Sequence, residues 1–305
     1  MGKPFHRLIP ALLAGLALVM ATSAGAQPLA KTLFGAVDGP SRGPSLAIGS
    51  YSRGCAQGLV RLPQTGPTWQ AMRLSRDRNW GMPETVSFIE DLSRYAATLR
   101  GWNGLYVGDI GQPRGGPMAS GHASHQMGLD VDIWMLPGTD MRLSRAEREK
   151  ISSIPIRTAD QRNVTRNWDR QHYLLMRRAA MDPRVDRIFV AAAAKIAMCN
   201  ATPANDRGWL QKIRPWFGHN YHFHVRLKCP SGDPLCRTQR PTVAKLSKGG
   251  DGCDATLNWW VTDLLNPPKG QPKKPAKPKG PPKRTARTYV LSDLPSQCAT
   301  VLSSP

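Results

Sequence analysis

Two histidine clusters constrain the fold of this chain more than any other feature. Residues 121–134 hold two histidines followed by two aspartates, and residues 219–227 hold three further histidines. Of the seven histidines in the chain, five fall in these two stretches. Histidines used as ordinary surface or core residues would be scattered. We therefore expect folding to bring the two clusters together as the halves of one metal site.

Both clusters continue into segments that alternate polar and apolar residues, which is the pattern of a strand with one buried face. In the first cluster the alternation places Asp130 and Asp132 on the same face. In the second, His222 and His224 share a face, with Cα atoms about 6.5–7 Å apart. The apolar residues between them should point into the core, so both strands would present polar side chains to the site.

The remaining pattern predicts an α+β fold, with a small central antiparallel sheet carrying a zinc site, surrounded by helices and long loops and stapled by disulfides. A loop rich in glycine and proline over residues 111–121 delivers the first cluster. Apolar spacing predicts a helix over residues 83–99. We also expect a strand over 105–110, helices over 142–152, over 165–182 and up to Cys199, and an irregular segment over 27–50.

The residue types in the clusters suit catalytic zinc, which takes three protein ligands and leaves one position for water, whose pKa falls to about 7. His125, Asp132 and one histidine of the second cluster would make such a set, and a neighbouring histidine would shuttle a proton. The chain has no His-Glu-x-x-His motif and only four glutamates. Histidine must therefore supply the acid and base chemistry.

The first 26 residues predict a cleaved signal peptide, with a positive start, an apolar run and a small-residue cleavage site. The chain has six cysteines, and an even number in an exported chain favours disulfides. Of the fifteen connectivities that six cysteines allow, spacing supports only a small loop between Cys229 and Cys236. Zinc binding by cysteine is the weaker alternative, because the chain has no Cys-x-x-Cys pair.

The formal net charge is +21, and residues 267–287 contribute eight lysines and arginines and no acidic residue. Such a stretch is compatible with nucleic acid. In an exported chain the anions of the cell envelope are better partners, and a solvated, extended linker is an equal alternative. We therefore predict no nucleic-acid partner.

The residues around the clusters resemble the penicillin-insensitive murein endopeptidases. This family belongs to the lysostaphin-type and D-alanyl-D-alanine metallopeptidase superfamily, which shares His-x6-Asp and His-x-His motifs. The resemblance covers almost the whole mature chain, including all six cysteine positions and the Lys/Pro-rich tail. It is carried by residues 121–133 and 212–230, by Ile48-Gly49-Ser50 to Cys55, by Gly108-Asp109, by Arg214-Pro215-Trp216-Phe217 and by Gly250-Asp251-Gly252-Cys253.

The resemblance implies a role for each residue of the site. His125, Asp132 and His224 would bind one catalytic Zn²⁺. His222 would act as general base or stabilise the tetrahedral intermediate, and His219 would line the catalytic site beside it. The implied disulfides are Cys55–Cys298, Cys199–Cys253 and Cys229–Cys236.

The family is sometimes described with a second metal position that draws on His122, an aspartate and a further histidine. Asp160 matches that aspartate, but Asn163 stands where the histidine is expected, which leaves the second ion open. Without that ion, His122 would line the site. Asp130 shares the face of Asp132 and either orients a ligand histidine or has a structural role.

The function implied by the resemblance is a periplasmic zinc peptidase that hydrolyses D-alanyl–meso-diaminopimelyl cross-links in peptidoglycan. Insensitivity to penicillin also has a basis in the residues, because the chain lacks the Ser-x-x-Lys and Lys-Thr-Gly motifs of enzymes acylated by β-lactams. A D-alanyl-D-alanine metallocarboxypeptidase on the same scaffold is the alternative. A third, non-catalytic hypothesis is an envelope-binding protein with structural zinc.

The expected organisation is a signal peptide (1–26), a zinc metallopeptidase domain (27–266), the basic linker (267–287) and a C-terminal segment (288–305) tethered through Cys298. Peptidoglycan is the expected substrate. No membrane-spanning segment is expected in the mature chain. A homodimer is the assembly to consider.

Overall fold

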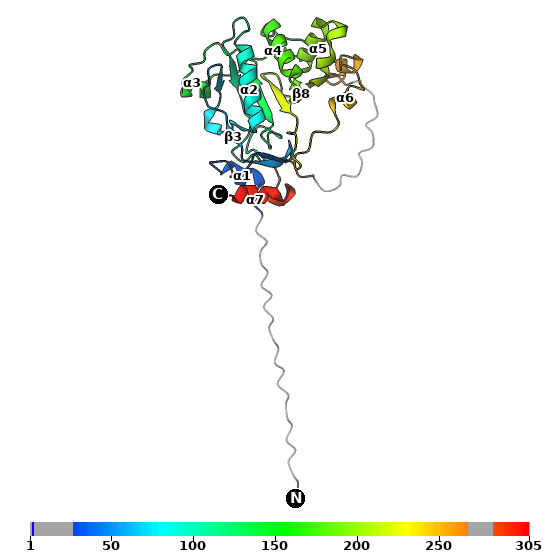
Figure 1. Ribbon diagram of the computed structural model, residues 1–305. Helices are drawn as coiled ribbons and strands as arrows, with labels where there is room; N and C mark the ends of the chain where they lie inside the picture. Colours follow the sequence, from blue (N-terminus) through cyan, green and yellow to red (C-terminus); the bar gives the residue numbers. More distant parts are fainter. Residues whose placement is uncertain (1, 3–26, 268–282, 305) are drawn as a thin grey trace.

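A six-stranded mixed sheet forms the centre of the computed structural model (Figure 1). The structure describes residue 2, residues 27–267 and residues 283–304. Apart from Gly2, the predicted signal peptide lies outside these residues, as does most of the predicted basic linker. Within the described part of the chain, no helix is long and apolar enough to cross a membrane.

The inner strands of this sheet pair in antiparallel fashion, and the outermost strand on each side pairs in parallel with its neighbour. In spatial order the strands are β4 (Trp69–Ala71), β6 (Leu105–Val107), β7 (Asp130–Trp134), β10 (His222–Leu227), β8 (Val185–Val190) and β9 (Ile213–Pro215). The fold combines helices and sheet, as predicted. The prediction of a small antiparallel sheet was wrong in both size and strand direction.

The parallel pairs follow from helical crossovers. The helix α2 (Pro83–Ala96) lies between β4 and β6 in the chain, and α5 (Ala192–Ala201) lies between β8 and β9. Parallel neighbours need a connection of this length, whereas antiparallel ones do not. The edge strands β4 and β9 have three residues each, which is too short to show an alternating pattern in the sequence.

In the upper part of Figure 1, the helix α4 (Arg170–Met181) packs against β8, α5 packs against β9, and α2 packs against α4. Pro83 occupies the first turn of α2, where its missing N–H removes no helical hydrogen bond. Phe88 and Ile89 on its inner face are fully buried. Three predicted helices, over 83–99, 142–152 and 165–182, were correct in place but too long, and the helix predicted up to Cys199 extends to Ala201. Ser144 and Asp169 cap the helices that begin at Arg145 and Arg170, which explains why these two start later than predicted.

Residues 27–50 are more regular than predicted. They contain α1 (Ala30–Gly35) and β1 (Leu46–Ser50), and β1 pairs with β2 (Arg53–Gln57). The helix α1 lies beside the C-terminal helix α7 (Gln297–Ser303) at the lower end of Figure 1. This segment looked irregular in the sequence because its apolar residues find their partners only near the other end of the chain.

The remaining elements are short. They are β3 (Val60–Arg61), paired with β5 (Trp80–Gly81), the helices α3 (Arg145–Lys150) and α6 (Val243–Leu246), and the 3₁₀ turns η1 (Leu74–Arg76), η2 (Ala204–Asp206), η3 (Gly208–Lys212), η4 (Ala255–Trp260) and η5 (Leu291–Asp293). Three disulfides, Cys55–Cys298, Cys199–Cys253 and Cys229–Cys236, connect the elements in the pairing that the family resemblance implied.

The strand β10 lies in the middle of the sheet and carries the second histidine cluster. In its register with β7, His224 lies opposite Asp132 and His222 opposite Trp134. The intervening Phe223 is 1 % exposed. The predicted alternation is therefore correct, and it turns the polar residues of both strands toward one site.

Candidate metal centre

His125 is presented by the loop over residues 111–128. Four glycines of this loop have positive φ, and so does His125 itself, at φ +66. A Cβ at Gly115 would lie 2.2 Å from the carbonyl oxygen of Gln126, so only glycine fits there. A non-glycine residue in the left-handed region costs about 1–3 kcal/mol, which the contacts around His125 must offset.

Two hydrogen bonds fix the position and the tautomer of His125. Its backbone N–H donates to Oδ2 of Asp130 at 2.9 Å, and its Nδ1 donates to the carbonyl oxygen of Ile110 at 2.8 Å. Because Nδ1 carries the proton, Nε2 of the neutral ring has a free lone pair. That lone pair faces the two strands.

His125, Asp132 and His224 bring three ligand atoms together. The Nε2 of His125 lies 3.1 Å from Nδ1 of His224 and 3.4 Å from Oδ1 of Asp132. The Nδ1 of His224 lies 3.2 Å from the same oxygen. All three residues are at most 4 % exposed. One loop and two strands therefore bring the three ligand atoms together in the buried interior.

The protons of this group point away from that enclosed point. The Nε2 of His224 donates to Oδ1 of Asp130 at 3.0 Å, which leaves its Nδ1 unprotonated in the neutral ring. The Oδ1 atom of Asp132 is buried and has no hydrogen-bond partner among the described residues. Two lone pairs and a carboxylate oxygen that face one another repel, so a cation suits the space between them.

The electrostatics favour positive charge at the same point. Burial lowers the pKa of His125, but Asp132 outweighs burial and raises that pKa to about 9. Burial would raise the pKa of Asp132, but the surrounding histidines, His222 first, hold it well below its usual range. The carboxylate of Asp132 is therefore ionised and available as a ligand.

Asp130 links the loop to the strands. Besides His125 and His224, Arg226 donates to both carboxylate oxygens of Asp130, at 2.7 and 3.2 Å. Burial raises the pKa of Asp130, but Arg226 and then His224 hold it well below its usual range. A carboxylate bonded to the outer nitrogen of an imidazole orients that ring for metal binding. Of the two roles considered for Asp130, its contacts favour the orienting one.

His122 lies on the solvent side of Asp132. Its Nε2 is 3.4 Å from Oδ2 of Asp132 and 3.0 Å from Oδ2 of Asp109. The ligand atoms of His122, His125 and Asp132 all lie within 4.8 Å of one another, so this group could hold a metal ion. Two overlapping ligand sets thus share His125 and Asp132 and differ in their third member.

Asp109 is a site residue for which we predicted no role beyond its place in the family pattern. Arg78 donates to its Oδ2 at 2.8 Å, and His122 contacts the same oxygen. Burial raises the pKa of Asp109, but the bond to His122 and the charge of Arg78 hold it well below its usual range. The sequence feature that could have identified Asp109 is its position at the end of a predicted strand, directly before the glycine loop.

His222 and His219 complete the open side of the centre. The Nε2 of His222 lies 3.6 Å from Oδ2 of Asp132, and the rings of His219 and His222 are 5.0 Å apart. Burial lowers the pKa of His222, and burial followed by the charge of His222 lowers the pKa of His219 to about 3. Both rings are therefore neutral near pH 7.

Asp160 lies on an exposed turn and is not part of this group. Its carboxylate accepts hydrogen bonds from Thr158 and from the backbone of Arg162 in the same turn. Asn163 bonds to Thr158 as well. The structure does not bring Asp160 into either ligand set described above.

A cleft of about 450 Å³ opens over His122, Asp132 and His222. Its other walls include two arginines, Arg73 and Arg76, and the carboxylate of Asp109, with which Arg76 forms an ion pair at 3.3 Å. Two larger hollows, of about 540 and 620 Å³, border the C-terminal segment, but neither is lined by a histidine. Of these three hollows, only the cleft of about 450 Å³ is lined by histidines.

The sequence profile of the penicillin-insensitive murein endopeptidase family matches residues 47–303. The chain belongs to this family. As a member it is a peptidase, and the match includes both histidine clusters and all six cysteines.

Named relatives extend over most of the chain. The penicillin-insensitive murein endopeptidase of Haemophilus influenzae is 40 % identical, over 86 % of this chain and 84 % of the relative. Those of Klebsiella pneumoniae and Escherichia coli O6:K15:H31 are each 37 % identical, over 93 % of this chain and 96 % of the relative. The similarity is therefore not confined to the site.

Proposed function

We propose that this family member is a zinc-dependent murein endopeptidase of the periplasm that hydrolyses D-alanyl–meso-diaminopimelyl cross-links. The proposal is carried by the convergence of His125, Asp132 and His224 on a point where a buried carboxylate oxygen has no hydrogen-bond partner in the described chain. Two imidazoles and a carboxylate are ligands that Zn²⁺ prefers. Tetrahedral ligands of one zinc ion lie about 3.3 Å apart, and these three atoms are separated by 3.1–3.4 Å.

When bound there, Zn²⁺ would supply Lewis acidity, which lowers the pKa of water and polarises a carbonyl group. His222 would accept the proton at Nε2, since its ring is unprotonated near pH 7 and borders the cleft beside Asp132. His219 would offer a second neutral imidazole on that side. Asp109 would hold the ring of His122 at the opposite wall of the cleft.

The cleft also suits the acidic peptide stems of peptidoglycan. A diaminopimelyl residue carries a free carboxylate beside the scissile nitrogen of the cross-link. Arg73 and Arg76 line the cleft. Arg76 already contacts Asp109 through one nitrogen at 3.3 Å, but its side chain is 46 % exposed, and its other N–H groups can bind a substrate carboxylate. A peptide with neutral ends would lack this attraction.

A periplasmic location agrees with the covalent structure. Three disulfides join all six cysteines, and such bonds persist in oxidising compartments. The predicted signal peptide would deliver the chain there. Peptidoglycan is accessible in the same compartment.

The decisive experiment is digestion of purified cross-linked muropeptide dimers by the zinc-loaded protein, followed by mass spectrometry. We expect conversion of dimers to monomers that stops with a chelator, returns with zinc and continues in penicillin. Trimming of terminal alanine with intact dimers would replace this proposal with the carboxypeptidase. Conversion that persists after complete removal of metal would exclude zinc dependence.

A further inference from the structure

Four aromatic side chains form a continuous surface beside the metal centre, here called the aromatic surface: Trp216, Phe217, Trp259 and Trp260. The first three are 53, 56 and 46 % exposed. Trp260 contacts each of the other three, with ring centroids 6.5, 5.2 and 5.6 Å away in that order. An exposed patch of large apolar side chains commonly marks a binding surface.

The aromatic surface begins at the wall of the metal centre. Trp216 packs on Phe189, with ring centroids 5.8 Å apart, and Phe189 contacts His219 at 5.9 Å and His224 at 5.4 Å. The same residues line a hollow of about 180 Å³. This hollow therefore joins two histidines of the metal centre to Trp216, the first ring of the aromatic surface.

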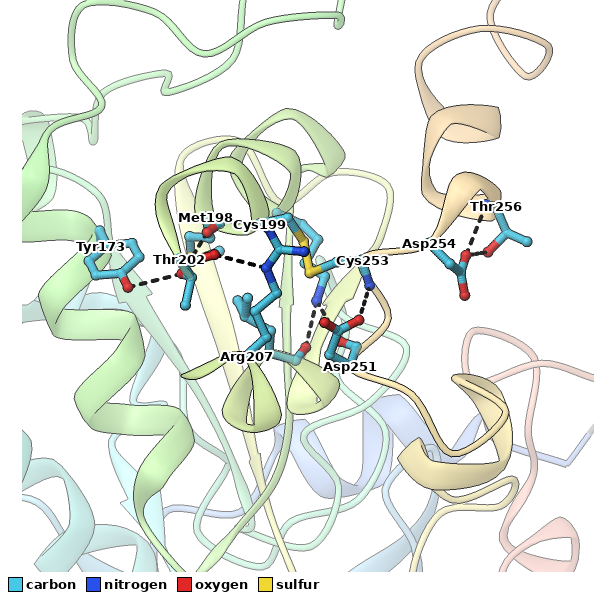
Figure 2. Close-up of a disulfide and its surroundings, with 11 residues drawn as sticks. Tyr173, Met198, Cys199, Thr202, Arg207, Asp251, Cys253, Asp254 and Thr256 are labelled. Atoms are coloured by element: carbon cyan, nitrogen blue, oxygen red, sulfur yellow. Dashed lines mark hydrogen bonds between the residues drawn. A yellow bond between two sulfur atoms is a disulfide. The ribbon is translucent and has the colours of Figure 1, made fainter. Parts of the chain in front are cut away.

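The framework under the aromatic surface is fixed by covalent and hydrogen bonds. The backbone N–H of Trp216 donates to the carbonyl oxygen of Val190 on β8 at 3.0 Å. The turn η4, which carries Trp259 and Trp260, follows Cys253 directly, and the disulfide from Cys253 to Cys199 attaches it to α5 (Figure 2).

The first turn of η4 is capped, since Asp254 accepts a hydrogen bond from the backbone N–H of Thr256 at 2.9 Å (Figure 2). Rings held in place before binding lose little conformational entropy when a ligand stacks on them. The aromatic surface is therefore organised for contact with a ligand rather than for closing a core.

We infer that the aromatic surface binds the glycan strand of peptidoglycan, with ring faces stacked on the apolar faces of its N-acetylated sugars. The inference rests on the proposed function, because it takes the scissile bond to lie at the metal centre. A peptide stem of about four residues spans at most about 14 Å. The sugars that carry a bound stem must therefore touch the protein surface bordering the site.

The cleft and the aromatic surface border the site on different sides and differ in chemistry. This difference favours the aromatic surface as the one that binds glycan. The cleft carries Arg73 and Arg76, which suit carboxylates of the stems. The aromatic surface consists of uncharged rings, which match the uncharged faces of sugar rings. A membrane-binding surface is the competing occupant, since exposed tryptophans also suit the lipid interface.

The test uses the full-length zinc-loaded protein and the double variant Phe217→Ala/Trp259→Ala. Both side chains are half exposed, and their ring contacts are with other aromatic residues. The carbonyl oxygen of Phe217 accepts a hydrogen bond from Nδ1 of His219 at 2.6 Å, but this atom belongs to the backbone and is kept in the variant. Met181→Ala, which removes a 58 % exposed side chain at the end of α4, is the matched control. Binding of an N-acetylglucosamine hexasaccharide is measured by calorimetry, and hydrolysis is compared on cross-linked dimers with and without their sugars.

We expect the double variant to bind the hexasaccharide about tenfold more weakly and to lose a similar factor in kcat/KM, through KM, on sugar-bearing dimers. Sugar-free dimers should be cleaved at the wild-type rate. An equal loss on both dimers, no loss on either, or lost binding to anionic phospholipid vesicles in place of the hexasaccharide would overturn the inference.

The two measurements, hexasaccharide binding and dimer hydrolysis, separate this inference from the proposed function. Hexasaccharide binding by the wild type that the double variant loses, with no cleavage of any dimer, supports the surface and refutes the function. Dimer cleavage by a wild-type protein that does not bind the hexasaccharide supports the proposed function and refutes glycan binding by the aromatic surface. If the double variant unfolds at a lower temperature, Phe217→Tyr/Trp259→Phe retains the stacking faces and should restore both readouts.

Discussion

The metal centre is assembled from two halves that position similar imidazoles by different physical means. The loop half, His122 and His125, depends on positive-φ glycines and on hydrogen bonds that offset a strained backbone. The strand half, Asp132, His222 and His224, depends on alternation and register in the middle of a sheet. A slip of one residue would turn every strand ligand to the other face of the sheet, so the register determines whether these ligands face the site. The loop half has no such periodic constraint.

The largest expected effect comes from removing one ligand from each half, with His125→Ala and His224→Ala. Each variant would leave two ligands, too few for a catalytic zinc site. We expect dialysed protein to lose its zinc and kcat/KM on muropeptide dimers to fall by at least about a thousandfold. Metal analysis and circular dichroism on the same samples separate loss of metal from loss of fold. One zinc per chain in either variant would disprove the ligand assignment.

The next comparison concerns the open-side histidines, with His222→Ala from the strand half and His122→Ala from the loop half. His222→Ala should keep its zinc and lose about 10²–10⁴-fold in kcat, the range for a general base. His122→Ala should also keep zinc and lose less activity, because its ring contacts Asp109 and Asp132 at the cleft wall.

Metal content of the same variants decides between the two overlapping ligand sets. If His122→Ala loses zinc while His224→Ala retains it, the group His122, His125 and Asp132 is the ligand set. That result would assign the metal to a site formed by the loop half and Asp132, without a ligand from β10.

Asp130 is the one carboxylate that touches both halves, so Asp130→Asn tests how far they act together. The substitution keeps the shape but weakens the bonds to His125, His224 and Arg226. We expect zinc affinity to fall about 10–100-fold in a chelator competition titration. Asp182→Asn, which removes a carboxylate bonded to Arg184 outside the site, is the control and should leave affinity unchanged. Equal affinities in both variants would assign Asp130 a purely structural role.

The contrast between the halves also explains what the sequence could predict. The faces of Asp130, Asp132, His222 and His224 follow from period-two alternation, which is a local property of each strand. His125 was assigned by residue type and spacing, but its left-handed backbone depends on a packed loop. The partners of Asp109 were not predictable, because Arg78 approaches from a separate segment and no periodicity marks either residue.

The same reasoning applies to the sheet edges and to the ends of the chain. The short strands β4 and β9 take their direction from helical crossovers, which a three-residue pattern does not encode. The pairing of α1 with α7 requires contact between residues near both ends of the chain, and no local signal reports such a contact. Local pattern therefore predicted the strand half of the site better than its surroundings.

The smallest expected effect compares one glycine from each half, with Gly128→Ala and Gly218→Ala. Both glycines have positive φ, at +67 and +75, so alanine is strained by about 1–2 kcal/mol at either position. At Gly128 the new Cβ would also lie 2.7 Å from Leu59 and 3.0 Å from the backbone nitrogen of Met82, whereas nothing lies within 4 Å at Gly218.

Urea unfolding should therefore show a larger loss of stability for Gly128→Ala than for Gly218→Ala, by roughly 1–3 kcal/mol. Zinc affinity should fall only in Gly128→Ala, because that glycine ends the loop that presents His125. If both variants lose the same stability and keep the same zinc affinity, close packing does not hold the loop half in place. The hydrogen bonds from His125 to Asp130 and Ile110 would then be sufficient to do so.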